Sequence, residues 1–331
     1  MTSAIVSSRS WRDGAVMDDH VTREELAAAV HDQGALVWVD LLNPSKGELR
    51  SIAAELGLPA TAVEDALAPL ERPKLIRHES HLFFTAYATR IDPPAADLTA
   101  GRLRWSRVSG IVLPFALVTI RLDDGVDMRG VLARWEENSD LLAEGSGALV
   151  HGLLDHVVDG HFEAIQALDE EIETLEDVLF AERSTGQGFV RRVYGVRKDL
   201  VALRRLVLPM REVVNGLLRQ SPATAPALRV WYDDLYDHVL RASEWTESLR
   251  DLVSSMFETN LSLQDARLNT IMKKLAGWAA IIAVPTAITG WFGQNVPYFG
   301  FGAPSGVWLS VALIVVAVLG LYAVFRQRDW L

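Results

Sequence analysis

Two long apolar runs near the C-terminal end of the chain constrain its fold more than any other feature. Residues 275–292 and 307–325 contain no Asp, Glu, Lys or Arg. As α-helices, runs of this length extend over roughly 27 to 29 Å, which is enough to cross the hydrocarbon layer of a bilayer. A pair of buried core helices is the alternative, but such a pair would need protein on every face. We therefore predict a first and a second membrane span.

The flanks of these spans predict their orientation. Lys273 and Lys274 precede the first span, Arg326 and Arg328 follow the second, and residues 293–306 between the spans carry no charge. Because basic residues remain on the cytoplasmic side, both termini are expected in the cytoplasm and the connecting loop outside. The first residues of the chain include no apolar signal segment. We expect a multi-pass protein of the inner (plasma) membrane, with its long polar part in the cytoplasm.

The two spans differ in composition. The second is almost purely aliphatic, as expected of a helix that faces lipid. The first contains Gly277, Pro285, Thr286, Thr289 and Gly290, and small or hydroxylated residues are typical of close helix packing or of a wetted lumen. One pair of spans cannot surround a pore, so a pore would need the first span of several copies.

The composition excludes several functions. Of the 331 residues, none is cysteine, which removes thiolate metal sites, cysteine nucleophiles and disulfides. A net charge of −11 argues against nucleic acid as a partner, because phosphate binding needs a basic face. The chain also lacks a Gly-rich phosphate loop and the GxSxG and HExxH motifs, so we predict that it is not an enzyme.

The polar part divides into regions of different periodicity. Strand-like runs at 35–41, 82–91, 104–112 and 115–122 alternate with helical segments, one of which begins at a capping box formed by Ser45 and Glu48. A helical pair follows, with a Gly-rich turn at 184–188, and one continuous helix is predicted from about 227 to 292, on the order of 100 Å long.

The predicted organisation therefore has seven parts. In chain order, these are an α/β domain at 1–144, an antiparallel helical pair at 145–225, a stalk helix at 226–274, the first span at 275–292, an outer loop at 293–306, the second span at 307–325 and a basic tail at 326–331.

The outer end of the first span carries the tripeptide Gly293-Gln294-Asn295. Further motifs are Glu-Arg-Pro-Lys at 71–74, Leu-Pro-Met-Arg-Glu-Val at 208–213, Tyr-Asp-Asp-Leu-Tyr-Asp-His at 232–238 and Asp-Trp-Leu at 329–331. With these motifs, the chain resembles the CorA family of divalent metal ion transporters, in which the tripeptide reads Gly-Met-Asn. Gln294 departs from that pattern, which bears on ion preference more than on fold.

The resemblance implies a fold and a function. The fold is an α+β membrane protein with a cytoplasmic α/β domain, an antiparallel helix pair and a long stalk helix that continues into the first span, assembled as a funnel-shaped homopentamer. The function is channel-type transport of divalent cations, Mg²⁺ first and Co²⁺ and Ni²⁺ as further substrates. Passive influx suffices, since a divalent ion gains roughly 4.6 kcal/mol across 100 mV.

Magnesium chemistry suits such an entrance. Mg²⁺ releases its water shell reluctantly, so neutral oxygen acceptors can receive the ion with its waters in place. A ring of Asn295 amides would do this, with Gly293 letting the backbone approach. The resemblance also implies the pore-lining residues below that ring, with Met272 and Leu275 as an apolar constriction that gates by dewetting. In order inward they are Thr286, Ala283, Ala279, Leu275, Met272, Asn269 and Glu258.

The same matching places a regulatory Mg²⁺ site between neighbouring subunits, on Asp92 and Asp234. Two carboxylates repel each other unless a divalent ion bridges them. Bound metal would therefore hold the assembly closed, and metal depletion would let the subunits separate.

Two other functions fit parts of the sequence. A ZntB-like zinc transporter is one, although neither span nor their loop contains the His or Cys ligands that zinc prefers. The histidine pairs at 78 and 81 and at 156 and 161 are possible zinc ligands, but we expect solvent or core positions for them. A membrane-anchored sensor without a pore is the other, and it would place the first span in lipid and make Asn295 dispensable.

Overall fold

The computed structural model describes residues 4–22, 26–28, 35–68, 71–93, 97, 99–181, 186–220, 226–294, 297–328 and 330. The chain divides into two compact units, residues 1–255 and 256–331.

A seven-stranded sheet forms the centre of the first unit. Its strands follow the order β2-β1-β3-β7-β6-β5-β4, in which β3 and β7 are parallel and the other pairs are antiparallel. The four strand-like runs of the sequence correspond to β3, β5, β6 and β7, so those predictions are confirmed. The strands are β1 Ile5–Arg12, β2 Ala15–Asp18, β3 Leu36–Leu42, β4 Lys74–Arg77, β5 Leu82–Ile91, β6 Leu103–Leu113 and β7 Ala116–Arg121.

The helices follow the predicted order. Among the described residues they are α2 Lys46–Glu55, α3 Ala60–Leu67, α4 Met128–Glu137, α5 Ser139–Leu142, α6 Ser146–Phe180, α7 Gln187–Val207, α8 Met210–Gln220, α9 Arg229–Phe292 and α10 Pro304–Gln327, with a short 3₁₀ turn at Pro226–Leu228 before α9. The capping box is present, because Ser45 accepts from the Glu48 N–H and the Glu48 carboxylate accepts from the Ser45 N–H.

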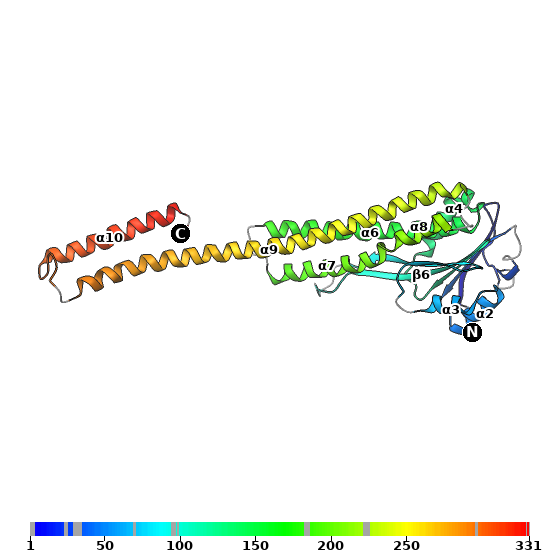
Figure 1. The fold of residues 1–331 in the computed structure, drawn as a ribbon, viewed down its shortest axis with the longest axis horizontal. Helices are drawn as coiled ribbons and strands as arrows, with labels where there is room; N and C mark the ends of the chain where they lie inside the picture. The colour runs from blue at the N-terminus through cyan, green and yellow to red at the C-terminus, as the bar shows by residue number, and fades with distance from the viewer. Residues whose placement is uncertain are drawn as a thin grey trace. The chain divides into compact units, whose positions relative to one another are not determined.

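Alternation along the strands creates two apolar layers. In β3, Val37, Val39 and Leu41 pack against α2 and α3, whereas Trp38 belongs to the cluster on the opposite face. That opposite cluster joins the sheet to α4, α6, α8 and the first turns of α9. Figure 1 shows α2 and α3 on one side of the sheet and α6 and α8 on the other.

The helical pair is more divided than predicted. The sequence indicates one helix after the Gly-rich turn, but α7 ends at Val207 and α8 begins at Met210. Pro209 explains the break, because it has no N–H to donate to the preceding turn. Part of the turn itself, residues 182–185, lies outside the described residues.

The second unit holds the C-terminal part of α9 and all of α10. These helices are the two in the described part of the chain that are long and apolar enough to cross a membrane. α10 begins at Pro304, three residues before the predicted second span, since proline at the first helical turn loses no hydrogen bond. The loop predicted at 293–306 therefore ends at Ala303.

Candidate functional site

The proposed pore residues share one face of α9. At about 100° per residue, they fall within a stripe roughly 120° wide. All of them are exposed in the single chain, including Met272 at 64% and Leu275 at 66%. The exposed residues of the stripe are Glu258, Asn269, Met272, Leu275, Ala279, Ala283 and Thr286. The stripe is therefore available for contact with other copies of the chain.

Hydroxyl groups near Pro285 donate to the backbone of their own helix. The Thr286 hydroxyl donates to the carbonyl of Ile282 at 3.2 Å. The Thr289 hydroxyl lies 2.9 Å from the carbonyl oxygen of Pro285 and 3.1 Å from that of Thr286. Their donors are used locally, so the lone pairs of the two oxygens remain to accept hydrogen bonds from water.

The tripeptide begins directly after Phe292, the last residue of α9. The Gly293 N–H donates to the Thr289 carbonyl at 2.9 Å, and the Gln294 N–H donates to the Trp291 carbonyl at 3.2 Å. A Cβ atom on Gly293 would lie 3.1 Å from the Thr289 oxygen, so a larger residue would strain this turn. Asn295 lies outside the described residues.

An aromatic cluster that the sequence motifs did not predict follows the tripeptide. Tyr298 stacks edge to face with Phe292, with ring centroids 4.8 Å apart, and with Phe301 at 5.3 Å. The Tyr298 hydroxyl also donates to the Phe292 carbonyl at 3.2 Å. The aromatic residues themselves are visible in the sequence. A loop has no periodic pattern, however, from which contacts between them could be predicted.

The regulatory candidate Asp92 directly follows β5 and is held by two arginines. Arg104 Nε lies 2.8 Å from one carboxylate oxygen and Arg90 Nε lies 3.4 Å from the other. The register of β5 and β6 places Arg90 opposite Arg104, which brings both cations to the same carboxylate. A divalent ion at Asp92 would have to share or displace these contacts.

The other regulatory candidate, Asp234, lies on the first turns of α9. Its side chain is 66% exposed, and His238 Nε2 lies 3.8 Å from its carboxylate. Within the described part of the chain, no three His, Asp or Glu side chains form a group that could hold a metal ion.

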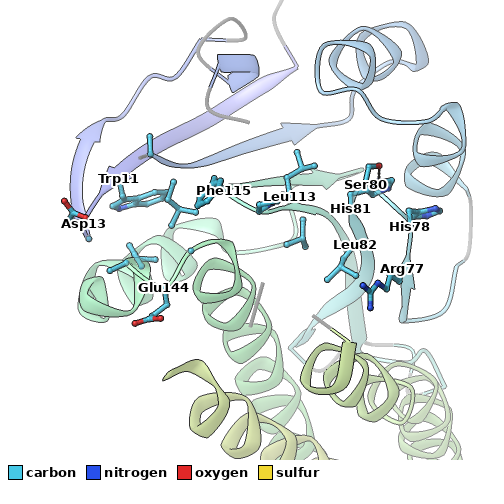
Figure 2. A pocket seen from close by; sticks show the side chains of 18 of the residues that line it. Trp11, Asp13, Arg77, His78, Ser80, His81, Leu82, Leu113, Phe115 and Glu144 are labelled. Carbon is cyan, nitrogen blue, oxygen red and sulfur yellow. Dashed lines mark hydrogen bonds between the residues drawn. The ribbon is translucent and has the colours of Figure 1, made fainter. Parts of the chain in front are cut away.

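The first histidine pair lines a cavity of about 490 Å³ at one end of the sheet. Figure 2 shows Trp11 and Asp13 at one end of this cavity and Arg77 and His78 at the other. The rings of His78 and His81 stack with centroids 4.4 Å apart. Burial, with a contribution from His78, lowers the pKa of His81 to about 4. The lone pairs of an imidazole lie in the plane of its ring, so those of two stacked rings do not converge on one point. The stacked arrangement therefore does not suit a zinc ion shared by His78 and His81.

His161 of the second histidine pair lies in the core. His161 is buried and its Nε2 lies 2.8 Å from the Tyr87 carbonyl oxygen, which fixes the ring in the core. Burial lowers the pKa of His161 to about 4. The expected core position is confirmed for this residue.

Two motifs that carried the resemblance have structural roles. The Glu71 carbonyl accepts a hydrogen bond from the Tyr87 hydroxyl, and Lys74 Nζ lies 3.1 Å from the Glu71 carboxylate. Tyr232 is buried, and its hydroxyl donates to the Gly147 carbonyl at 2.8 Å. Burial raises the pKa of the Tyr232 phenol. These contacts hold parts of the first unit together.

Comparison with known proteins shows that the chain is similar to metal ion transporters. The family model described as CorA-like Mg²⁺ transporter protein matches residues 33–327. The cobalt/magnesium transport protein CorA of Methanocaldococcus jannaschii is 26% identical over 319 residues, 95% of this chain and 97% of that relative. The protein of the same name from Thermotoga maritima is 27% identical over 320 residues, 94% of this chain and 88% of that relative.

Solved structures share the fold. The complete CorA magnesium transporter from Methanocaldococcus jannaschii matches with a TM-score of 0.74 and 24% identity, covering 98% of this chain and 99% of that one. The ZntB cytoplasmic domain from Vibrio parahaemolyticus matches with a TM-score of 0.55 and 14% identity, covering 78% of this chain and 98% of that domain. The likeness to ZntB is the more distant of the two.

Proposed function

The chain belongs to the CorA-like Mg²⁺ transporter protein family, and on that basis we propose that it conducts hydrated Mg²⁺ along an axis lined by α9 from several copies. The observation that carries this proposal is the exposed stripe on α9, which has no charge from Leu275 onward. In the sequence, Gly293-Gln294-Asn295 follows α9 directly. The assembly is the homopentamer that the resemblance implies. It lies in the inner (plasma) membrane with both termini cytoplasmic.

Selection at the outer end would work through water. The amide of Asn295 offers a neutral oxygen to the first hydration shell, and a ring of such groups compensates an ion that keeps its waters. The lone pairs of Thr286, nine residues before Asn295 in the chain, continue the same chemistry further in. Met272 and Leu275 form the apolar constriction, which conducts only when it is wetted.

Replacing Asn295 with Ala tests the entrance. Hydrogen bonds to charged species are worth about 1.5 to 3 kcal/mol, so Mg²⁺ uptake into proteoliposomes should fall about 10- to 100-fold while the unfolding midpoint stays unchanged. Gln327→Ala removes an exposed amide at the end of α10 and is the matched control. Wild-type uptake by Asn295→Ala would eliminate the pore and favour the anchored sensor.

The ion preference distinguishes Mg²⁺ from zinc. The proposed path contains oxygen donors and no His or Cys, which favours a hard ion over Zn²⁺. Neither span has an ionisable group to relay a proton, so flux should not require a pH gradient. Uptake of Mg²⁺, Co²⁺, Ni²⁺ and Zn²⁺ with and without such a gradient tests both points. Zinc uptake that depends on the gradient would support the ZntB-like alternative.

Regulation by cytoplasmic Mg²⁺ is the second part of the proposal. Asp234 is exposed and would meet Asp92 of a neighbouring copy, with the ion relieving the repulsion between them. Asp234→Ala should weaken the protection from proteolysis that millimolar Mg²⁺ confers. Asp233→Ala, a change of the adjacent and similarly exposed carboxylate, should leave the protection intact. Full protection of the Asp234 variant would refute this site.

A further inference from the structure

The backbone of Asp92 is bonded to a single residue of the neighbouring strand end. Asp92 is the residue after β5, and Arg102 is the residue before β6. The Asp92 N–H donates to the Arg102 carbonyl at 2.9 Å, and Arg102 Nε donates to the Asp92 carbonyl at 2.8 Å. The position of the Asp92 backbone therefore depends on that of Arg102.

Arg102 is held in turn by Asp199, a residue of α7. One oxygen of the Asp199 carboxylate accepts from the Arg102 N–H at 2.8 Å, and the other accepts from the Leu103 N–H at 3.0 Å. Asp199 is 4% exposed. A Cβ atom on Gly101 would lie 2.5 Å from a carboxylate oxygen of Asp199, so the approach requires glycine. Hydrogen bonds to an ionised carboxylate are stronger than those between neutral groups.

The other helix of the pair, α6, holds the same arginine. Arg102 Nη1 donates to the Glu171 carboxylate at 2.5 Å, and Arg192 Nη2 lies 3.6 Å from the second Glu171 oxygen. The Glu171 side chain is only 14% exposed. Asp199 is also the single acidic residue in a helix with six Arg and Lys, so it does not belong to an acidic face of α7. Asp92 is thus connected to both helices through Arg102.

We infer that Asp199 is a positioning residue for Asp92, and that it couples the regulatory site to the helical pair. By holding the backbone of Arg102 and Leu103, Asp199 orders the segment from which the Asp92 carboxylate extends. Less ordering then remains to be done when the ion binds, which favours binding. Because such coupling is reciprocal, Mg²⁺ at Asp92 should stabilise α7 around Asp199. The inference rests on the proposed function, since it concerns the regulation assigned to Asp92.

Exchange of one oxygen atom for an amino group tests the positioning. In Asp199→Asn, the amide oxygen can accept one backbone N–H, but the NH₂ group faces the other. We expect the Mg²⁺ concentration for half-maximal protection from proteolysis to rise about 3- to 10-fold, the size of an ordinary hydrogen bond. Protection at saturating Mg²⁺ should reach the wild-type level. Asp127→Asn makes the same change where the carboxylate caps α4 and should leave that concentration unchanged.

Hydrogen exchange of the full-length protein separates coupling from a purely structural role. In the wild type, Mg²⁺ should slow the exchange of the α7 amides around Asp199, and in Asp199→Asn this slowing should be lost. A structural role alone would speed exchange equally with and without Mg²⁺. That result would overturn the inference.

Gly101→Ala perturbs the same contact from the other side. Its Cβ atom would push against the Asp199 carboxylate, so the required Mg²⁺ concentration should rise as it does in Asp199→Asn. The two changes should not add in the double variant, because both act on one contact. An unchanged concentration in either single variant, or additive shifts, would overturn the inference. Full protection of Asp234→Ala would instead refute the regulatory site, and the inference with it.

Discussion

The two units of the chain treat polar and apolar side chains in opposite ways. In the first unit, Trp38 and Val39 are fully buried and even the charged pair Asp40 and Arg121 is enclosed. In the second unit, large apolar side chains face outward, among them Val316, which is 70% exposed. Burial of apolar side chains, as in the first unit, is favourable in water, whereas exposure of large apolar side chains, as in the second, costs free energy.

The difference shows which unit encloses paired polar groups. The first unit contains buried hydrogen-bond networks, such as the one in which Thr119 accepts from Trp38 Nε1 at 3.0 Å and donates to Asp40 at 2.7 Å. The second unit leaves an exposed apolar surface of a kind that marks contact with lipid or with other copies. We therefore expect stability to depend on the first unit and conduction on the second.

The largest effect is expected at the buried ion pair. Asp40→Ala leaves the Arg121 guanidinium enclosed without its main partner, which should lower the free energy of unfolding by about 3 to 5 kcal/mol. Asp124 contacts the same arginine, but its side chain is 84% exposed. Asp124→Ala should cost under about 1 kcal/mol in chemical denaturation of the purified protein. Equal losses in the two variants would contradict an enclosed pair.

A pH-dependent loss of stability should follow from His161. Its pKa is lowered to about 4 in the folded protein, against about 6.5 in the unfolded chain. Below pH 6.5 the unfolded chain binds a proton that the folded protein does not, so the free energy of unfolding falls as the pH falls and levels off near pH 4.

The slope should approach about 1.4 kcal/mol per pH unit within that window. His161→Gln offers an amide donor to the same Tyr87 carbonyl but does not titrate. Denaturation of both proteins from pH 7.5 to pH 4 should therefore give a shallower pH dependence for the variant. Parallel curves would show that another group is responsible.

The smallest effect on stability, with a separate effect on flux, is expected in the second unit. Leu275→Ser should change the free energy of unfolding by less than about 0.5 kcal/mol, since the side chain is exposed in the single chain. A wetter constriction should lower the barrier by about 1 kcal/mol, raising Mg²⁺ leak about fivefold in the presence of millimolar Mg²⁺. Leu319→Ser on α10 has similar exposure and should leave the leak unchanged.

Equal leak in the Leu275 and Leu319 variants would remove the functional distinction between the two spans. The comparison between the units would then reduce to one between a stable domain and a membrane anchor.

The fold could be predicted from the sequence where a pattern repeats. β3, β5, β6 and β7 have apolar runs of strand length, and α9 shows no proline or glycine for many turns before the membrane. β1 and β2 were not predicted, because neither shows an apolar face in the sequence. β1 is rich in Ser and Arg, and every residue of β2 is exposed. Pro209 is a signal for the break between α7 and α8. The helical pattern continues on both sides of it, however, so a single helix was predicted.

The candidate site was predictable along α9 and less so elsewhere. Helical periodicity places the stripe from Glu258 to Thr286 on one face without knowledge of any contact. The two arginines at Asp92 depend on the register of a hairpin, which the sequence does not specify residue by residue. The bond from Tyr298 to Phe292 depends on the path of an irregular loop, for which no periodicity exists.

The threonines beside Pro285 have one more consequence. Because the hydroxyls of Thr286 and Thr289 donate to carbonyls of their own helix, a pore lined by Thr286, as proposed, would present electron pairs, not protons, to a passing ion. Chloride would find no hydrogen to bind there, whereas the water shell of a cation offers hydrogens freely. A pore lining of this kind can select cations over anions without a carboxylate inside the bilayer.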